Sequence, residues 1–159
     1  MMDIVTQEKR SEMMSAIRGK DTTPEMVIRR GLHALNYRFR LHSKDLPGKP
    51  DIVLLKWKAV IFVNGCFWHG HNCHLFKWPK TREKFWKEKI RGNMKRDAEV
   101  SRSLEEAEWR VLVIWECAIK GRMRLPVELV MRKCSEWIRS SSTELEIFGG
   151  GNDYTQSTD

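Results

Sequence analysis

The chain has 159 residues, of which 41% are hydrophobic and 31% charged, values typical of one globular domain with its own core and not of a largely disordered chain. No apolar run approaches the roughly 20 residues of a membrane-spanning helix, and the N-terminus lacks a signal-peptide core, so we expect a cytoplasmic protein. The net charge of +8 favours nucleic acid as a partner over a membrane surface, because no basic amphipathic anchor is evident; a merely basic soluble protein is the alternative.

The first part of the chain is predicted to hold one helix. Residues 1–20 are polar with scattered apolar side chains, so they could form a short helix but contribute little to a core. Thr22 and Glu25 have the spacing of a capping box, which predicts that a helix begins there. Its apolar residues continue to Leu35.

A hairpin is predicted next. Residues 37–41 alternate like a short strand, and residues 43–50 form a turn-rich loop. The apolar runs 51–55 and 59–63 are separated by a short polar turn, which predicts two antiparallel strands with Asp51 at one end.

The second half alternates between helix and strand. A long helix is predicted from Thr81 to about Ala107, a buried strand at 109–115 and a covering helix at 125–138. The order of elements predicts an α/β domain with a mixed central sheet over residues 1–139. Residues 140–159 are rich in Ser, Thr and Gly and are expected to be a flexible tail.

The loop after the strand 59–63 is rich in metal ligands. Because the cytoplasm is reducing, close Cys/His groups indicate metal binding rather than disulfides. Two cysteines and a histidine of this loop, with a cysteine after strand 109–115, would complete the closed tetrahedral set of a structural zinc. Spacing leaves His69 and His74 open as replacements, and the cysteines could instead be buried apolar residues; Cys134 is expected in the core. The four predicted ligands are Cys66, His71, Cys73 and Cys117.

Three residues are candidates for phosphodiester hydrolysis. Asp51, at the mouth of the hairpin, suits Mg²⁺ as a hard oxygen ligand. His69 could take the proton of a water molecule near neutral pH, and Glu25 could hold that imidazole in the right tautomer. Each has a structural alternative, since Asp51 could cap a turn, His69 could be a surface or zinc histidine, and Glu25 already fits the capping box.

Four segments together resemble the very short patch repair (Vsr) DNA mismatch endonuclease family. The resemblance runs from about Ser11 to Ile138 and implies a restriction-endonuclease-like fold. It also implies a nick 5′ to the thymine of a T:G mismatch, which arises when 5-methylcytosine deaminates. The segments are PGKPD (47–51), NGCFWHGHNC (64–73), FWKEKIRGNMKRD (85–97), and WRVLVIWEC (109–117) followed by GRMRL.

The resemblance also implies residue roles. Asp51 would bind Mg²⁺ with the backbone carbonyl of Val63, His69 would activate water, and Glu25 would support His69. The zinc ligands would be the four predicted above, with His71 as the histidine. Two features depart from known patterns. A better-known member of the family has Thr and His where this chain has Val63 and Asn64. The chain also lacks the acid-x-lysine half of the wider PD-(D/E)xK nuclease motif, which makes His69 more necessary as the base.

The long helix is predicted to bind DNA. Residues 80–96 contain eight Lys or Arg against two Glu, and Trp86, Lys89 and Asn93 recur on one face. Packing of Trp86 in the core is the alternative. Asp97 is expected to face inward, where it could orient a water or His69, or pair with an arginine.

Aromatic residues at the loop tip are predicted to be exposed wedges. Phe67 and Trp68 could enter between base pairs, at the lowest cost beside a mismatch. By resemblance these two and Trp86 intercalate from one groove and Met14 approaches from the other, while Lys89 and Asn93 contact the mismatched pair.

The leading hypothesis is therefore a Mg²⁺-dependent, strand-specific mismatch nickase with a structural zinc. One alternative is a zinc-stapled DNA-binding module that recognises distorted duplex without cleavage, which would need neither Asp51 nor His69. Another is a restriction enzyme that cuts both strands of paired DNA. The expected partner is duplex DNA containing a T:G mismatch, bound by a monomer, with a functional link to a cytosine-5 methyltransferase.

Overall fold

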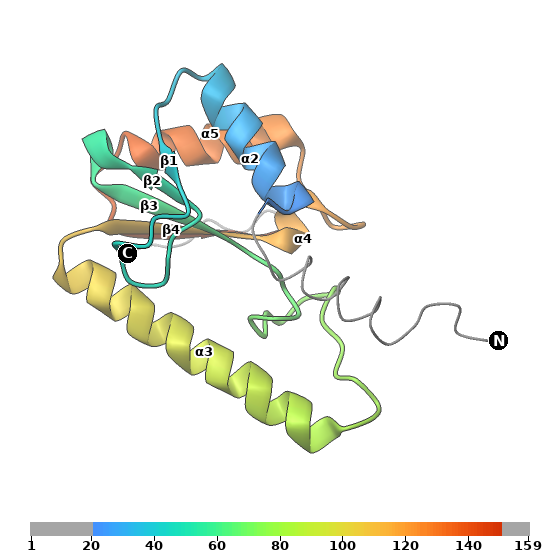
Figure 1. Cartoon of the computed structure of the whole chain (residues 1–159). Helices are drawn as coiled ribbons and strands as arrows, with labels where there is room; N and C mark the ends of the chain where they lie inside the picture. Colours follow the sequence, from blue (N-terminus) through green and yellow to red (C-terminus); the bar gives the residue numbers. More distant parts are fainter. Residues whose placement is uncertain (1–20, 151–159) are drawn as a thin grey trace.

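A five-stranded mixed sheet lies at the centre of the computed structural model, which describes residues 21–150 (Figure 1). The strand order follows the sequence. β1, β2 and β3 are antiparallel neighbours, whereas β3, β4 and β5 run parallel. The predicted mixed α/β sheet is therefore confirmed. The strands are β1 (Arg40–Leu41), β2 (Ile52–Leu54), β3 (Ala59–Asn64), β4 (Arg110–Trp115) and β5 (Glu144–Ile147).

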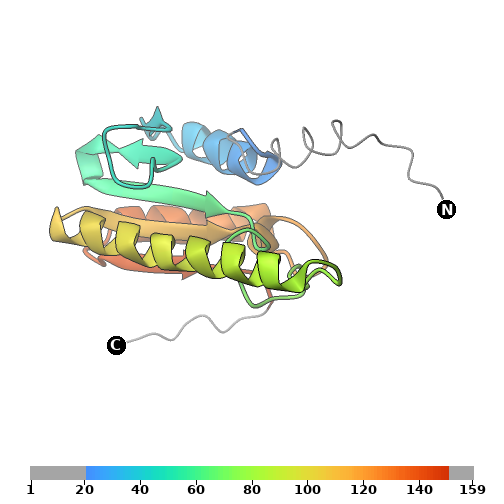
Figure 2. The same cartoon turned by 60° about the horizontal axis from the view of Figure 1, so that its bottom comes forward.

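Helices cover both faces of this sheet. α2 and α5 pack together on one face, and α3 crosses the other (Figures 1 and 2). Side chains of β3 alternate between the two layers, since Ile61 belongs to the core under α2 and α5 whereas Val60 packs with Leu104 of α3. None of the helices within residues 21–150 is long and apolar enough to cross a membrane. The helices are α2 (Thr23–Ala34), α3 (Glu83–Glu106), α4 (Glu116–Ile119) and α5 (Val127–Ile138).

The predicted hairpin of β2 and β3 is confirmed, and it places Asp51. Ile52 is paired with Ile61, and the connection is a 3₁₀ turn that ends at Lys58 in the left-handed conformation. Asp51 therefore precedes β2 at the end of the hairpin where β3 finishes. This is the end of the sheet at which α2 also begins (Figure 1).

The prediction of a flexible tail over 140–159 is wrong for residues 144–147. This segment forms β5, which pairs in parallel with β4, and Ile147 is buried. The alternation of Glu with Leu and Ile in ELEI is the strand signal, but the serines before it and the glycines after it obscured it. Residues 1–20, with Met14, and residues 151–159 lie outside the described part of the chain.

Candidate active site and metal centre

A cleft of about 610 Å³ opens where β3 ends, between the start of α2 and the middle of α3. All three predicted catalytic residues line it. Asp97 and several residues that were not predicted as catalytic line it too. Its lining includes Glu25, Asp51, Val63, Trp68, His69, Asn93 and Asp97, and the basic residues Lys49, Arg96 and Lys120.

Asp51 is held by the neighbouring strand. One of its carboxylate oxygens, Oδ2, accepts a hydrogen bond from the backbone N–H of Val63 at 2.7 Å. The pKa of Asp51 is raised from its ordinary value of 3.8 to about 6, chiefly by burial and also by the nearby charge of Glu25, although the Val63 hydrogen bond lowers it. A carboxylate that is this costly to ionise would gain from a cation beside it.

His69 is paired with Asp97. Its Nδ1 lies 2.6 Å from Oδ2 of Asp97, which α3 contributes to the cleft. A carboxylate at Nδ1 fixes that nitrogen as the protonated one, so that Nε2 is left with its lone pair. An imidazole held in this way by a carboxylate has the geometry that a general base requires. Of the two roles considered for Asp97, the structure therefore supports the orientation of His69.

Glu25 does not contact His69, so the prediction that Glu25 holds this imidazole is wrong in this structure. Its carboxylate is 2% exposed and is engaged by other partners: Oε2 lies 2.6 Å from Nε2 of His42 and accepts from Nε of Arg29 at 3.1 Å. Oε1 accepts from the backbone N–H of Asp21 at 3.0 Å. No periodicity links His42 to this helix, since the histidine arrives on the loop after β1, and sequence reasoning missed it.

The four predicted zinc ligands come together. The ligand atoms of Cys66, His71, Cys73 and Cys117 all lie within 4.8 Å of one another. Nδ1 of His71 is 3.6 Å from Sγ of Cys66 and 3.7 Å from Sγ of Cys117. Zinc bonded tetrahedrally to nitrogen and sulfur places such atoms about 3.6 Å apart, so the cluster fits that ion. His71, and not His69 or His74, belongs to the cluster.

Neighbouring groups favour a cation at this cluster. The pKa of Cys117 is lowered, chiefly by its hydrogen bond with Cys66, whose own pKa is raised in return. The backbone N–H of Gly149 also donates to Sγ of Cys117 at 3.4 Å. The ring of His71 stacks on Trp115 with centroids 4.2 Å apart and planes 9° apart, which fixes its orientation. A bound metal ion would stabilise the thiolate forms of Cys66 and Cys73 as well.

The predicted exposure of the loop aromatics is wrong for Trp68, which is only 8% exposed. Its ring lies 5.1 Å from that of Phe67 and 5.8 Å from that of Trp86, and Phe67 and Trp86 are both half-buried. The reason is that α3 brings Trp86 against the loop, so the rings bury one another in a compact group. These three residues, Phe67, Trp68 and Trp86, are called the aromatic cluster below.

The polar face of α3 lies beside the aromatic cluster. Asn93 donates from its side-chain amide to the backbone carbonyl of Trp68 at 2.9 Å and accepts from Arg96 at 3.1 Å. Lys89 is half-buried one turn earlier on the helix. The predicted face of Trp86, Lys89 and Asn93 thus runs from the aromatic cluster toward the cleft.

Sequence comparison finds similar proteins among DNA endonucleases. A family model described as DNA mismatch endonuclease Vsr matches residues 2–75. The chain is 42% identical to the DNA mismatch endonuclease Vsr of Escherichia coli K12 over 147 residues, covering 92% of this chain and 94% of the relative. It is 45% identical to the type II nicking enzyme V.XorIIP of Xanthomonas oryzae, over 78% of this chain and 96% of that enzyme. A type II nicking enzyme of Neisseria meningitidis, V.NmeAIP, is 44% identical over 77% of this chain and 87% of its own length.

Proposed function

The chain belongs to the Vsr family of DNA mismatch endonucleases, and from this premise we propose that it is a Mg²⁺-dependent nickase that cuts one strand 5′ to the thymine of a T:G mismatch. The observation that carries the proposal is the meeting of Asp51 with the His69–Asp97 pair in one cleft. A module that only binds distorted DNA needs neither a buried carboxylate nor an oriented imidazole. Deaminated 5-methylcytosine is the proposed source of the mismatch, which links the enzyme to a cytosine-5 methyltransferase.

Each catalytic residue has a task that follows from its contacts. Asp51 and the backbone carbonyl of Val63 would hold the Mg²⁺ ion, which supplies charge neutralisation at the scissile phosphate. His69 takes the proton of the attacking water at Nε2, while Asp97 keeps the proton on Nδ1 and stabilises the imidazolium that results. Glu25 acts through its neighbours, because its carboxylate is occupied by His42 and Arg29.

The DNA is proposed to lie along α3. The basic residues of 80–96 would contact phosphates, and Lys89 and Asn93 would reach the mismatched pair. The aromatic cluster would separate base pairs beside the mismatch. Since Trp68 is packed in the free protein, intercalation exchanges contacts among the rings for contacts with bases, at a cost that is lowest where the pair is already weakened. The zinc cluster, as a structural site, would keep this loop rigid.

A plasmid assay separates the nickase from a restriction enzyme that cuts both strands of paired DNA. Perfectly paired supercoiled plasmid should stay largely intact with Mg²⁺, whereas the same plasmid carrying one T:G pair should become an open circle. Linearisation of the paired plasmid would favour the restriction enzyme instead. Duplexes with randomised bases around the T:G pair would then define the sequence context.

Replacement of Trp68 by Ala should weaken mismatch preference more than overall DNA affinity. We expect the ratio of affinities for T:G and paired duplexes to fall about tenfold, which corresponds to about 1.4 kcal/mol, because the ring is the proposed wedge. Fluorescence anisotropy with both duplexes measures the ratio. Trp78→Ala is the matched control, since Trp78 is 43% exposed and lies outside the aromatic cluster. An unchanged ratio with weaker binding to both duplexes would argue against intercalation.

Asp51→Asn should abolish nicking and yet stabilise the magnesium-free protein. Because the folded state raises the pKa of Asp51 to about 6, ionisation of this carboxyl opposes folding at neutral pH. Asn keeps an acceptor for the Val63 N–H without the charge, so we expect a gain of about 1–3 kcal/mol in the free energy of unfolding at pH 7. The gain should shrink as the pH falls from 6 toward 4, where wild-type Asp51 becomes protonated in both states. Urea unfolding of both proteins at several pH values measures it; a gain independent of pH would refute this reason.

A further inference from the structure

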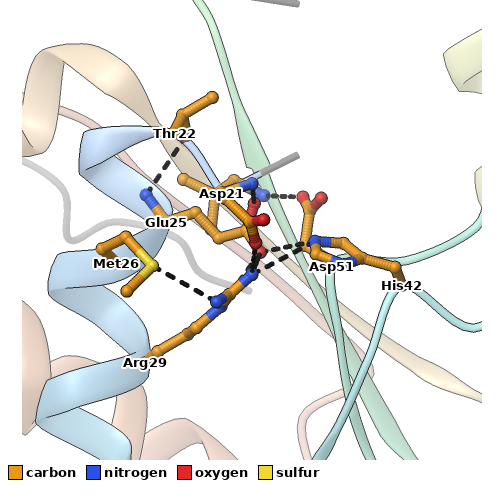
Figure 3. A network of polar contacts seen from close by, with 8 residues as sticks. Asp21, Thr22, Glu25, Met26, Arg29, His42 and Asp51 are labelled. Carbon is orange, nitrogen blue, oxygen red and sulfur yellow. Dashed lines mark hydrogen bonds and ion pairs between the residues drawn. The ribbon is translucent and has the colours of Figure 1, made fainter. Parts of the chain in front are cut away.

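The described chain holds a second group of possible metal ligands, apart from the cysteine cluster. The carboxylates of Asp21 and Glu25 and the ring of His42 offer ligand atoms within 4.8 Å of one another. The backbone N–H of His42 donates to the carbonyl of Asp51 at 3.0 Å, so this group adjoins the proposed magnesium site (Figure 3). By its donor atoms alone, the group could hold a divalent cation.

The guanidinium of Arg29 already lies among these ligands. Arg29 follows Glu25 by one turn of α2, and its Nη2 contacts the carboxylates of both Asp21 and Glu25, the latter at 2.5 Å (Figure 3). The same nitrogen is 3.4 Å from Nε2 of His42. The side chain of Arg29 is only 14% exposed. All three possible ligands therefore face one cation that the protein itself supplies.

Charge explains why a metal ion would be excluded. Two carboxylates close together attract a divalent cation, but the guanidinium offsets one of their charges and occupies their hydrogen-bonding positions. Burial alone lowers the pKa of Arg29, but the hydrogen bonds to Asp21 and Glu25 outweigh it and raise the pKa above its ordinary value. Arg29 is thus a permanent cation, and an ion could enter only by displacing it.

We propose that Arg29 is a resident cation that takes the place of a second divalent ion beside Asp51, so that the enzyme works with one catalytic ion. The inference rests on the proposed function for the ion at Asp51. Two-metal nucleases hold their ions about 3.5–4 Å apart with shared carboxylates. Here Glu25, a second carboxylate that lines the same cleft as Asp51, is committed to Arg29 and His42. Arg29 is a positioning residue, because it acts through Glu25.

The test counts Mn²⁺ ions bound by the full-length, zinc-loaded protein, using electron paramagnetic resonance of free Mn²⁺. Wild type should bind one ion, and Glu25→Gln should leave that number unchanged. Arg29→Met, which removes the charge but keeps the aliphatic stem, should bind one ion more. The additional ion should disappear in the Arg29→Met/Glu25→Gln double variant, and Arg29→Lys should behave as wild type. Arg30→Ala, an exposed neighbour on α2, is the matched control and should also bind one ion.

Two results would overturn the proposal. One is a wild type that binds two ions and loses one in Glu25→Gln. The other is a folded Arg29→Met protein, checked by circular dichroism, with the wild-type number of ions. If Arg29→Met does not fold, the comparison of wild type with Glu25→Gln still decides. Asp51→Ala removes the first ion if the proposed function is right, and the one-ion difference between Arg29→Met and wild type does not depend on that outcome.

Discussion

His69→Ala is expected to lower the rate of nicking of a T:G duplex by about 10²–10⁴-fold, because a positioned general base contributes about that much. Asp97→Ala should cost less, roughly 10–100-fold, since Asp97 only orients the imidazole. Single-turnover rates at saturating protein measure both effects without interference from product release. DNA affinity should change little in either variant.

The double variant gives the sharper result. If Asp97 acts through His69, removal of both side chains should be no worse than removal of His69 alone. Losses that multiply in the double variant would mean that Asp97 has a separate task. His33→Ala is the matched control, because His33 is exposed on α2 and should retain the wild-type rate.

Loss of the proposed zinc site is expected to have the largest effect on stability. Cys117→Ser replaces a proposed zinc ligand. Its Sγ lies near His71 and also accepts from the backbone N–H of Gly149, so Cys117 joins the loop, β4 and the segment after β5. We expect zinc content to fall well below one ion per chain and the free energy of unfolding to fall by several kcal/mol, since metal binding and folding are coupled. Metal analysis and thermal unfolding of the purified proteins measure this.

Cys134→Ala separates the loss of a ligand from the loss of a buried cysteine. Cys134 is fully buried in the core and is no part of the cluster, so this variant should keep its zinc despite some loss of packing. Full zinc and unchanged stability in Cys117→Ser would refute the ligand set. Reduced zinc in Cys134→Ala would show that zinc content follows general stability and not ligation.

The sequence predicted correctly those features that depend on residues close together in the chain. Thr22 caps α2 by accepting from the backbone N–H of Glu25, and the hairpin of β2 and β3 forms where the apolar runs and the turn placed it. Cys66, His71 and Cys73 are also close in sequence, and Cys117 follows a buried strand that pairs with β3. The parallel pairing of β3 with β4 therefore brings Cys117, the last proposed ligand, to the loop.

The errors concern contacts between segments that are distant in sequence. Glu25 was predicted to support His69, but its carboxylate contacts Arg29 and His42 instead. The sequence reveals neither the side-chain conformation of Arg29 nor the path of the loop that brings His42 to Glu25. Trp68 was expected to be exposed, yet α3 supplies Trp86 to cover it. In both cases a side chain takes the partner that tertiary packing brings nearest, which periodicity and spacing do not specify.

The central claim is that one cleft, with Asp51 and His69 as its reacting groups, cuts one strand at a T:G mismatch. The most direct measurement follows a duplex with each strand labelled separately, containing T:G or the matched C:G pair, with Mg²⁺ and with EDTA. We expect a single nick 5′ to the thymine, only with Mg²⁺ and only in the T:G duplex, and its loss in Asp51→Ala. Tight binding to the T:G duplex without a nick, or equal nicking of both duplexes, would contradict the claim.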